Sequence, residues 1–267
     1  MKYINCEQYA NEILDEVKQV THKKYFAIVS VGNNPASQSY IKGKIKDCEY
    51  CGIPYIHTNI NLETDVNPKL SLEYTLRALA ADETVSAIIL QLPLPEGWDE
   101  EYFLSFIPEA KDVDGFSENS PFRPCTPEGV ISVLKTDLGD LTGKHALVIG
   151  RGKLVGIPLI ADLMVANCTV TVAHSKSNKD KVFYGTEYDI VVCAAGRHNL
   201  LDLLKLKGAP IVIDVGVNKV NGKLCGDCFN FSEEAHDDMR VTPVPKGIGL
   251  MTRAMLMKHI AEVNKEG

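Results

Sequence analysis

Apolar and polar positions alternate between two patterns along the first 90 residues of the chain. Short β-branched, apolar runs are typical of buried strands, and they lie at Phe26–Val31 and Val85–Leu90, with a further strand predicted at Tyr55–Ile60. Between the strands, Tyr40, Lys44 and Asp47/Cys48 are spaced three or four positions apart, which predicts a helix over residues 36–51, and Pro68 is placed to begin a helix over residues 68–81. A further helix is predicted over residues 5–20. Strands that alternate with helices indicate parallel β-α-β units and an α/β fold.

The same alternation resumes after a short, polar, proline-rich segment at residues 117–125, which we interpret as a linker. A helix should begin at Thr126-Pro127, since Thr caps helices and Pro favours their first turn. Asn221-Gly222 predicts a hairpin turn, and residues 251–264 predict a last amphipathic helix. Further buried strands are predicted at residues 144–149, 169–173, 189–194 and 210–215. The chain therefore contains a second α/β domain.

Composition narrows the possible partners. The chain of 267 residues is 45% hydrophobic and 24% charged, as in ordinary globular proteins. Its formal net charge of −7 repels nucleic acid and anionic membrane surfaces, so we expect neither as a partner. The N-terminus shows no apolar signal core, and no apolar run is long enough to span a bilayer. We expect a cytoplasmic protein.

Eight cysteines raise the question of a metal site. Cys48-x-x-Cys51 and Cys225-x-x-Cys228 have the spacing of zinc ligands. The first pair, however, lies in a predicted helix, and the pairs are 174 positions apart (225 − 51). Asp112-Val113-Asp114-Gly115 is similar to the start of a calcium loop but lacks its later ligands. We predict free thiols and no metal.

Four polar residues of the first half are placed for chemistry. Tyr40 and Lys44 lie one turn apart on a helix that follows a buried strand, and Gln91 ends another strand. Ligands of open α/β sheets bind at this carboxyl edge. A partly desolvated Lys can act as a general acid or base, Gln91 could orient it, and Asp114 could grip an amidine-like edge. Each residue alone is also compatible with a structural role on a helix surface, strand end or turn.

The second half carries a glycine-rich turn. The strand at residues 144–149 ends in Gly150-Arg151-Gly152, and Val155-Gly156 follow in a G-x-G-x-x-x-G spacing. A strand, such a turn and a helix beginning near Leu154 form a dinucleotide site with the pyrophosphate at the helix N-terminus. A tight structural turn would show the same residues. A cleft between the two domains is the expected place for chemistry.

The ends of the next strands indicate which dinucleotide is bound. Where an NAD site places an acidic residue, this chain has His174-Ser175-Lys176. These residues and Arg151 favour a 2′-phosphate, so NADP is preferred over NAD. Small residues at the ends of two further strands, Ala195-Gly196 and Val215-Gly216, would let a ring or ribose approach the backbone.

Taken together, several ordered motifs are more specific than any of them alone. They are VGNNPASQSYIKGK, QLPLP, KDVDGF, PCTPEGV, GRGKLVGIP, HSKS and PVPKGIGLMT. By these motifs, which span nearly the whole chain, the protein resembles the bifunctional methylenetetrahydrofolate dehydrogenase/methenyltetrahydrofolate cyclohydrolase family.

The resemblance implies two reactions. NADP would oxidise 5,10-methylenetetrahydrofolate to the methenyl form, which would be hydrolysed to 10-formyltetrahydrofolate. Lys44 would be the general acid/base, Gln91 would hold and tune it, and Tyr40 would stack on the folate. Asp114 would bind the pterin, while Arg151 and Ser175 would hold the 2′-phosphate. Further substrate contacts would come from Leu92, Pro93, Pro245, Gly247 and Gly249.

The resemblance also implies a layout. Residues 1–118 with 250–267 would form the folate-binding catalytic domain, and residues 119–249 a Rossmann NADP-binding domain through which the protein forms a homodimer. The chain departs from the family pattern, since Lys246 replaces a Gly, Leu250 a Pro and Gly152 a Ser. A dehydrogenase with weak or absent cyclohydrolase activity is therefore an alternative. A binder without turnover and a Rossmann dehydrogenase acting on a small carbonyl acid are two others.

Overall fold

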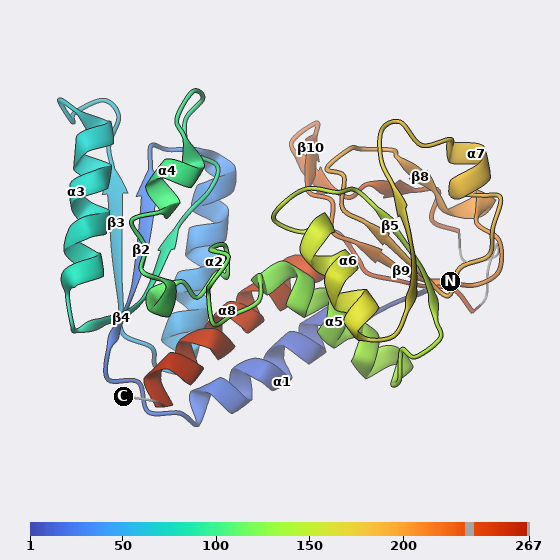
Figure 1. The fold of residues 1–267 in the computed structure, drawn as a ribbon, viewed down its shortest axis with the longest axis horizontal. Coiled ribbons are helices and arrows are strands. Elements are labelled where there is room, and N and C mark those ends of the chain that lie inside the picture. Colours follow the sequence, from blue (N-terminus) through green and yellow to red (C-terminus); the bar gives the residue numbers. More distant parts are fainter. Residues whose placement is uncertain (233–237, 266–267) are drawn as a thin grey trace. The chain divides into compact units, whose positions relative to one another are not determined.

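The computed structural model describes residues 1–232 and 238–265, and its chain divides into two compact units (Figure 1). Residues 11–125 and 253–267 form a unit around a three-stranded sheet. Residues 1–10 and 126–252 form a unit around a six-stranded sheet. We refer to them as the three-stranded unit and the six-stranded unit.

The three-stranded unit confirms the predicted strands and helices. The sheet has the order β3-β2-β4 and is parallel throughout, with Ala27 between Ile56 and Ile88. Central strand β2 is buried over nearly its whole length. The elements are β2 (Tyr25–Val31), α2 (Pro35–Cys51), β3 (Tyr55–Ile60), α3 (Pro68–Ala81) and β4 (Val85–Leu90). The sequence pattern missed short helices α4 (Glu100–Leu104) and η1 (Glu109–Lys111).

Helix α2 is fixed at both ends by its own sequence. The Asn34 side chain accepts hydrogen bonds from the N–H groups of Ala36 and Ser37, and Pro35 occupies the first turn. At the other end, Gly52 adopts a left-handed φ of 71° and satisfies helix carbonyls. The helix therefore begins directly after β2, which places its residues near the carboxyl edge of the sheet.

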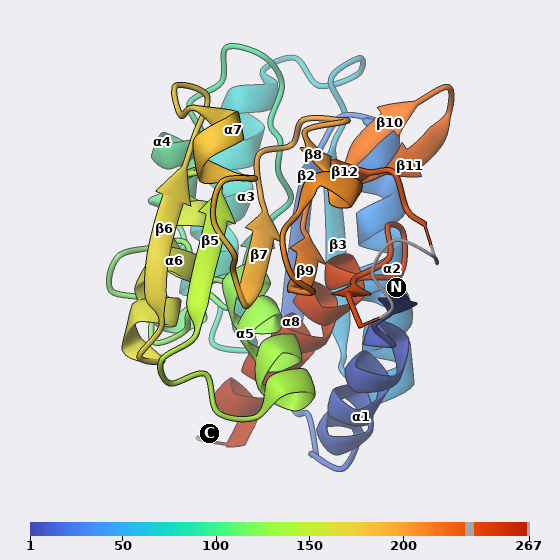
Figure 2. The same cartoon turned by 90° about the vertical axis from the view of Figure 1, so that its right-hand side faces the viewer.

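The six-stranded unit has the doubly wound pattern of a nucleotide-binding domain. Figure 2 shows β6, β5, β7 and β9 side by side, and all pairings of this sheet are parallel, in the order β1-β13-β9-β7-β5-β6. Its predicted members are β5 (His145–Ile149), β6 (Thr169–Ala173), β7 (Ile190–Cys193) and β9 (Ile211–Asp214). The helices are α5 (Cys125–Leu138), α6 (Gly156–Val165) and the short α7 (Lys179–Val182). An α/β fold with two parts is confirmed.

Short elements complete the unit. The hairpin predicted around Asn221-Gly222 is present, with positive φ at both residues and strands β10 (Asn218–Val220) and β11 (Lys223–Cys225). The pattern did not predict β8 (Leu201–Asp202), η2 (Leu203–Lys205) or β12 (Cys228–Phe229). Helices α1 (Cys6–Lys18) and α8 (Ile248–Lys265) were predicted within a few residues of their ends.

The N-terminal residues differ from the expected domain layout. Strand β1 (Lys2–Tyr3) pairs with β13 (Arg240–Val241) and extends the six-stranded sheet. Residues 1–10 therefore group with this unit, whereas the domain expected from the sequence placed them with the folate-binding residues. A two-residue strand carries no periodicity, so its partner is decided by long-range pairing.

Two findings on the described residues concern partners. In that part of the chain no helix is both long and apolar enough to cross a membrane. Within residues 1–232 and 238–265, no group of three or more His, Cys, Asp or Glu side chains could hold a metal ion. Cys225 is half-buried, and the other cysteines are buried.

Candidate active site

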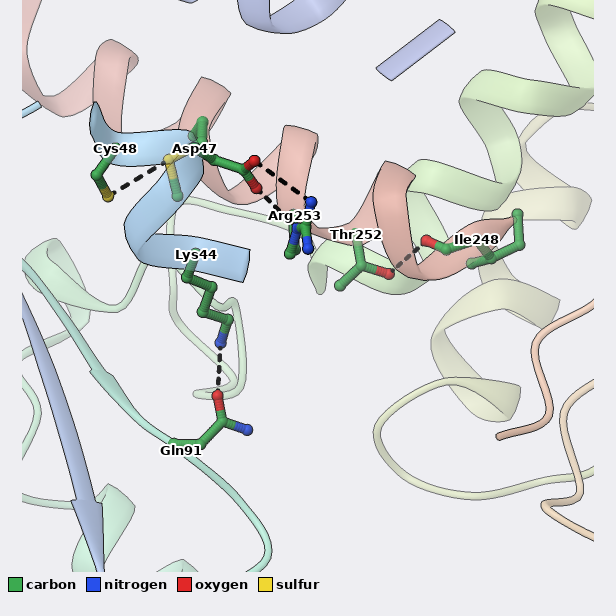
Figure 3. Close-up of polar contacts among 8 residues, drawn as sticks. Lys44, Asp47, Cys48, Gln91, Ile248, Thr252 and Arg253 are labelled. Carbon is green, nitrogen blue, oxygen red and sulfur yellow. Dashed lines mark hydrogen bonds and ion pairs between the residues drawn. The ribbon is translucent and has the colours of Figure 1, made fainter. Parts of the chain in front are cut away.

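Lys44 and Gln91 meet at the carboxyl edge of the three-stranded sheet. Lys44 Nζ donates to Gln91 Oε1 at 3.1 Å (Figure 3), and only 6% of Lys44 is exposed. Gln91 directly follows β4, and its N–H donates to Val29 O, which extends the strand pairing. Its Nε2 donates to Leu92 O at 2.8 Å, so the amide presents its oxygen to Lys44. The predicted pair is thus brought together.

Tyr40 lies one turn before Lys44 on α2 and is half-buried. Burial raises the pKa of its phenol, and the positive charge of Arg253 partly opposes this effect. The phenol hydroxyl therefore stays protonated at neutral pH, and Tyr40 presents an apolar ring face and a polar hydroxyl. Leu92 and Pro93, which the resemblance assigns to substrate contact, continue the chain after Gln91 and are half-buried and exposed, respectively.

Sequence reasoning missed an ion pair beside this lysine. Arg253 of α8 contacts Asp47 of α2, with Nε 2.7 Å from Oδ2 and Nη2 donating to Oδ1 at 3.3 Å (Figure 3). Burial raises the pKa of Asp47, while Arg253 opposes the shift. A Cβ on Gly43 would lie 2.0 Å from Arg253 Nη1, so Gly43 leaves room for the Arg253 side chain in its present position. A glycine inside a helix, next to Lys44, was the available sequence signal.

The loop that carries Asp114 is held by its neighbour Asp112. The buried Asp112 carboxylate accepts the N–H groups of Gly115 at 3.0 Å and Ser117 at 2.7 Å. Burial raises the pKa of this carboxyl against the effect of these hydrogen bonds. The carboxylate of Asp114 is half-buried and has no hydrogen-bond partner among the described residues, so it remains available to a ligand.

The six-stranded unit contains a pocket of about 380 Å³ at the carboxyl ends of β5, β6 and β7. Six residues predicted to bind the cofactor line it: Gly150, Arg151, Gly152, His174, Ser175 and Ala195. The other six predicted residues are not among its lining: Val155, Gly156, Lys176, Gly196, Val215 and Gly216. Lys179 and Arg197 line the pocket and were not predicted, because no local motif marks either.

The residues of this pocket fit a phosphate-bearing nucleotide. Three cationic side chains and His174 line it, with no carboxylate among the lining residues. Gly150 has a φ of 123°, and a Cβ there would lie 2.3 Å from Ala194 O. A Cβ on Gly156 would lie 2.5 Å from Gly150 O. The sequence predicted that this helix would begin near Leu154, but α6 begins at Gly156. The residues before Gly156 form the turn in which these close approaches occur.

The predicted substrate contacts Pro245, Gly247 and Gly249 belong to the six-stranded unit. Gly247 is buried, and a Cβ there would lie 2.1 Å from Pro243 O. Lys246 adopts a left-handed φ of 74°, and its Nζ lies 3.4 Å from Glu7 Oε2. The residue that departs from the family pattern therefore occupies a backbone conformation suited to glycine.

Comparisons with known proteins identify the two domains of the chain. Residues 4–114 match the family model of the tetrahydrofolate dehydrogenase/cyclohydrolase catalytic domain, and residues 124–267 match that of its NAD(P)-binding domain. The bifunctional protein FolD of Campylobacter jejuni subsp. doylei is 41% identical over 250 residues, which cover 90% of this chain and 87% of that protein.

Solved structures show the same relationship. The FolD methylenetetrahydrofolate dehydrogenase/cyclohydrolase from Campylobacter jejuni has a TM-score of 0.90 at 35% identity, covering 100% of this chain and 99% of that one. The Trypanosoma brucei enzyme, complexed with NADP and an inhibitor, has a TM-score of 0.87 at 28% identity, covering 99% and 97%.

A two-unit α/β protein with a buried lysine in one unit and a nucleotide pocket in the other is a candidate dehydrogenase. The matches cover nearly all of the chain, so the protein belongs to the tetrahydrofolate dehydrogenase/cyclohydrolase family. It is an enzyme with a catalytic domain and an NAD(P)-binding domain.

Proposed function

We propose that the protein oxidises 5,10-methylenetetrahydrofolate with NADP and hydrolyses the methenyl product to 10-formyltetrahydrofolate, with Lys44 as the general acid/base. The observation that carries this proposal is the buried Lys44 with its hydrogen bond to Gln91 at 3.1 Å. In the hydrolysis, Lys44 would act from its neutral amine form, taking a proton from the attacking water and passing it to the folate nitrogen that is released as the ring opens. Gln91 accepts an N–H of Lys44 and thereby fixes the direction of its nitrogen.

Substrate recognition would use the neighbours of this pair. Tyr40 offers a half-buried aromatic face next to Lys44, on which a flat pterin ring can stack. Asp114 offers a carboxylate without an internal partner, and a carboxylate can accept two hydrogen bonds from the amino-pyrimidine edge of a pterin. Leu92 and Pro93 would add contacts from the loop after Gln91. Pro245, Gly247 and Gly249 are proposed as substrate contacts on the resemblance to the family alone.

NADP supplies the hydride acceptor when it is bound, and the chain's part is to hold it. Arg151 and Ser175 lie in the lining of the 380 Å³ pocket, as do Lys179 and Arg197. Cationic and hydroxyl groups suit a 2′-phosphate, whereas an NAD site needs a carboxylate for the ribose hydroxyls. The absence of any carboxylate from the pocket lining favours NADP over NAD.

A homodimer formed through the six-stranded unit is the assembly that we propose. Strand β6 is an edge strand of the sheet, and Val172 on it is exposed. On α6, the side chains of Ile157, Met164 and Val165 are also exposed, with 71% exposure at Val165. Exposed apolar groups beside an unpaired strand edge suit burial against a second copy. Sedimentation at several concentrations tests this proposal, and a monomer at every concentration would exclude it.

The location and remaining partners follow the expectations from the sequence. We propose a cytoplasmic enzyme, since all eight cysteines are free thiols, as in a reducing compartment. The net charge of −7 gives no support to a nucleic-acid partner. Cell fractionation tests the location, and recovery with secreted proteins would contradict it.

An ultraviolet assay tests the function itself. Pure protein is mixed with methylenetetrahydrofolate and either NADP or NAD, and reduced cofactor and methenyl product are followed separately. We expect reduction of NADP in preference to NAD, without accumulation of the methenyl absorbance. Accumulation with only background decay would support the dehydrogenase with weak cyclohydrolase activity. Absence of reduction with both cofactors would refute the proposal.

A further inference from the structure

The exposed loop after β7 is held by hydrogen bonds to one buried carboxylate, that of Asp227. Ala195, Gly196 and Arg197 are all exposed, and two of them line the nucleotide pocket. Their backbone N–H groups nevertheless point to Asp227: Oδ2 accepts those of Ala195 at 3.0 Å and Gly196 at 2.9 Å, and Oδ1 that of Arg197 at 2.7 Å. Three consecutive amides thus share a single partner.

Asp227 is built to stay in this place. Its exposure is 0%, and Oδ1 also accepts Nδ2 of Asn218 at 2.9 Å. A carboxylate without access to water is strongly destabilising unless its oxygens are hydrogen-bonded, and here four N–H donors satisfy them. The loop and the carboxylate therefore depend on each other, although 30 positions separate Arg197 from Asp227.

A second carboxylate supports the first. Asp214, at the end of β9 and 1% exposed, accepts the N–H of Asp227 at 3.0 Å and that of Gly216 at 2.9 Å through Oδ1. Its Oδ2 accepts the N–H of Cys228 at 2.9 Å. Its own N–H donates to Thr242 Oγ1 at 2.8 Å. This network connects the end of β9, the exit of the hairpin and the beginning of the 242–249 loop.

Two glycines make room for the carboxylates. A Cβ on Gly216 would lie 2.1 Å from Asp227 Oδ1, and a Cβ on Gly226 would lie 1.9 Å from Asp214 Oδ2. The sequence suggested that Gly216 lets a cofactor approach the backbone. The structure gives a different physical reason for this glycine, because the space above it is occupied by Asp227.

We propose that Asp227, supported by Asp214, is a positioning residue of the nucleotide site. It holds the backbone of residues 195–197 so that Arg197 and the loop backbone are presented to the cofactor, without touching the cofactor itself. This inference rests on the proposed function for the identity of the ligand. The arrangement of the loop in the cofactor-free protein is independent of the proposed function.

Hydrogen exchange of the cofactor-free protein tests the loop directly. In the wild type we expect slow exchange of the amides of residues 195–197 despite their exposure. Asp227→Asn replaces one acceptor oxygen by an N–H donor facing other donors, and should raise their exchange rates about 10-fold or more. The matched control is Asp140→Asn in the turn before β5, where the carboxylate accepts Thr142 N–H. It should leave these amides unchanged. Unprotected amides in the wild type would refute the inference, whatever the cofactor.

NADPH binding, followed by fluorescence, tests the consequence. We expect the Kd of Asp227→Asn to rise about 10-fold, while hydrolysis of methenyltetrahydrofolate, which needs no cofactor, changes less than about 2-fold. If this variant does not fold, Gly226→Ala displaces the supporting Asp214 carboxylate while keeping every hydrogen-bonding group, and should give the same two changes. Faster exchange with an unchanged Kd would overturn the positioning role. A wild type that binds no NADPH would instead refute the proposed function and leave the exchange result standing.

Discussion

Two lysines of the three-stranded unit show how differently a buried or partly buried amino group can be used. Lys44 on α2 is 6% exposed and donates one hydrogen bond, to the side chain of Gln91. Lys111 at the end of η1 donates to three backbone carbonyls at the end of α3: those of Leu79 at 3.1 Å, Ala80 at 2.8 Å and Asp82 at 2.7 Å.

The number of hydrogen-bond partners distinguishes a lysine that can take part in catalysis from one with a structural role. An ammonium has three N–H donors, and the carbonyls at the end of α3 use all three of Lys111. Burial lowers the pKa of Lys111, yet no N–H remains for a substrate. At Lys44, Gln91 accepts one N–H. The other positions on Nζ remain available to exchange protons with a ligand. The carbonyls of Leu79 and Ala80 belong to the last turn of α3, where helix carbonyls lack partners within the helix, so Lys111 caps α3 and anchors the start of the Asp112–Asp114 loop.

The largest expected effect follows from replacing Lys44. Lys44→Ala should lower the rate of methenyl hydrolysis about 10³-fold, because the general acid/base is lost. Thermal unfolding should change little, since the side chain has only one hydrogen bond to lose. Absorbance of the methenyl group measures the rate after subtraction of the uncatalysed reaction.

Lys44→Arg is the matched control for this prediction. Arginine keeps the positive charge and can still donate to Gln91, but its guanidinium does not lose a proton in proteins. This variant should be as inactive as Lys44→Ala. Substantial hydrolysis by Lys44→Arg would show that charge alone suffices, and the distinction between the two lysines would fail.

Lys111 should behave in the opposite way. Lys111→Met keeps the aliphatic length and removes three bonds to helix carbonyls, which should lower the free energy of unfolding by about 2 kcal/mol. Well below the unfolding temperature, the hydrolysis rate should stay within about 3-fold of the wild type. Denaturant unfolding measures the stability, with the exposed Lys42→Met on α2 as control. An unchanged denaturant midpoint of unfolding would show that Lys111 does not stabilise the three-stranded unit.

Local signals in the sequence explain what could be predicted. Strands β3 and β4 and helix α3 have the predicted bounds, because apolar runs and helix-starting prolines are features of adjacent residues. The spacing of Tyr40 and Lys44 likewise needs only the geometry of one helix. Lys44 and Gln91 were selected together because both follow strands of one parallel sheet.

The remaining parts of both sites depend on distant pairs. Arg253 meets Asp47 across 206 positions, and Asp227 meets Arg197 across 30. Neither pair changes the local pattern, so one sequence alone did not reveal them. Strand β1 was missed for the same reason, since two residues acquire a strand conformation only through their pairing with β13.

A third lysine, Lys246, provides the smallest effect and the sharpest contrast. It is exposed, has a φ of 74°, and its contact with Glu7 at 3.4 Å is exposed as well. A left-handed conformation costs a non-glycine residue about 1 kcal/mol, and an exposed ion pair contributes less than this. Lys246→Gly should therefore raise the free energy of unfolding by about 0.5–1 kcal/mol in denaturant titrations. Lys246→Ala loses the ion pair but keeps the strain, so it should not stabilise the protein. Equal gains in both variants would mean that the side chain, and not the backbone, destabilises this loop.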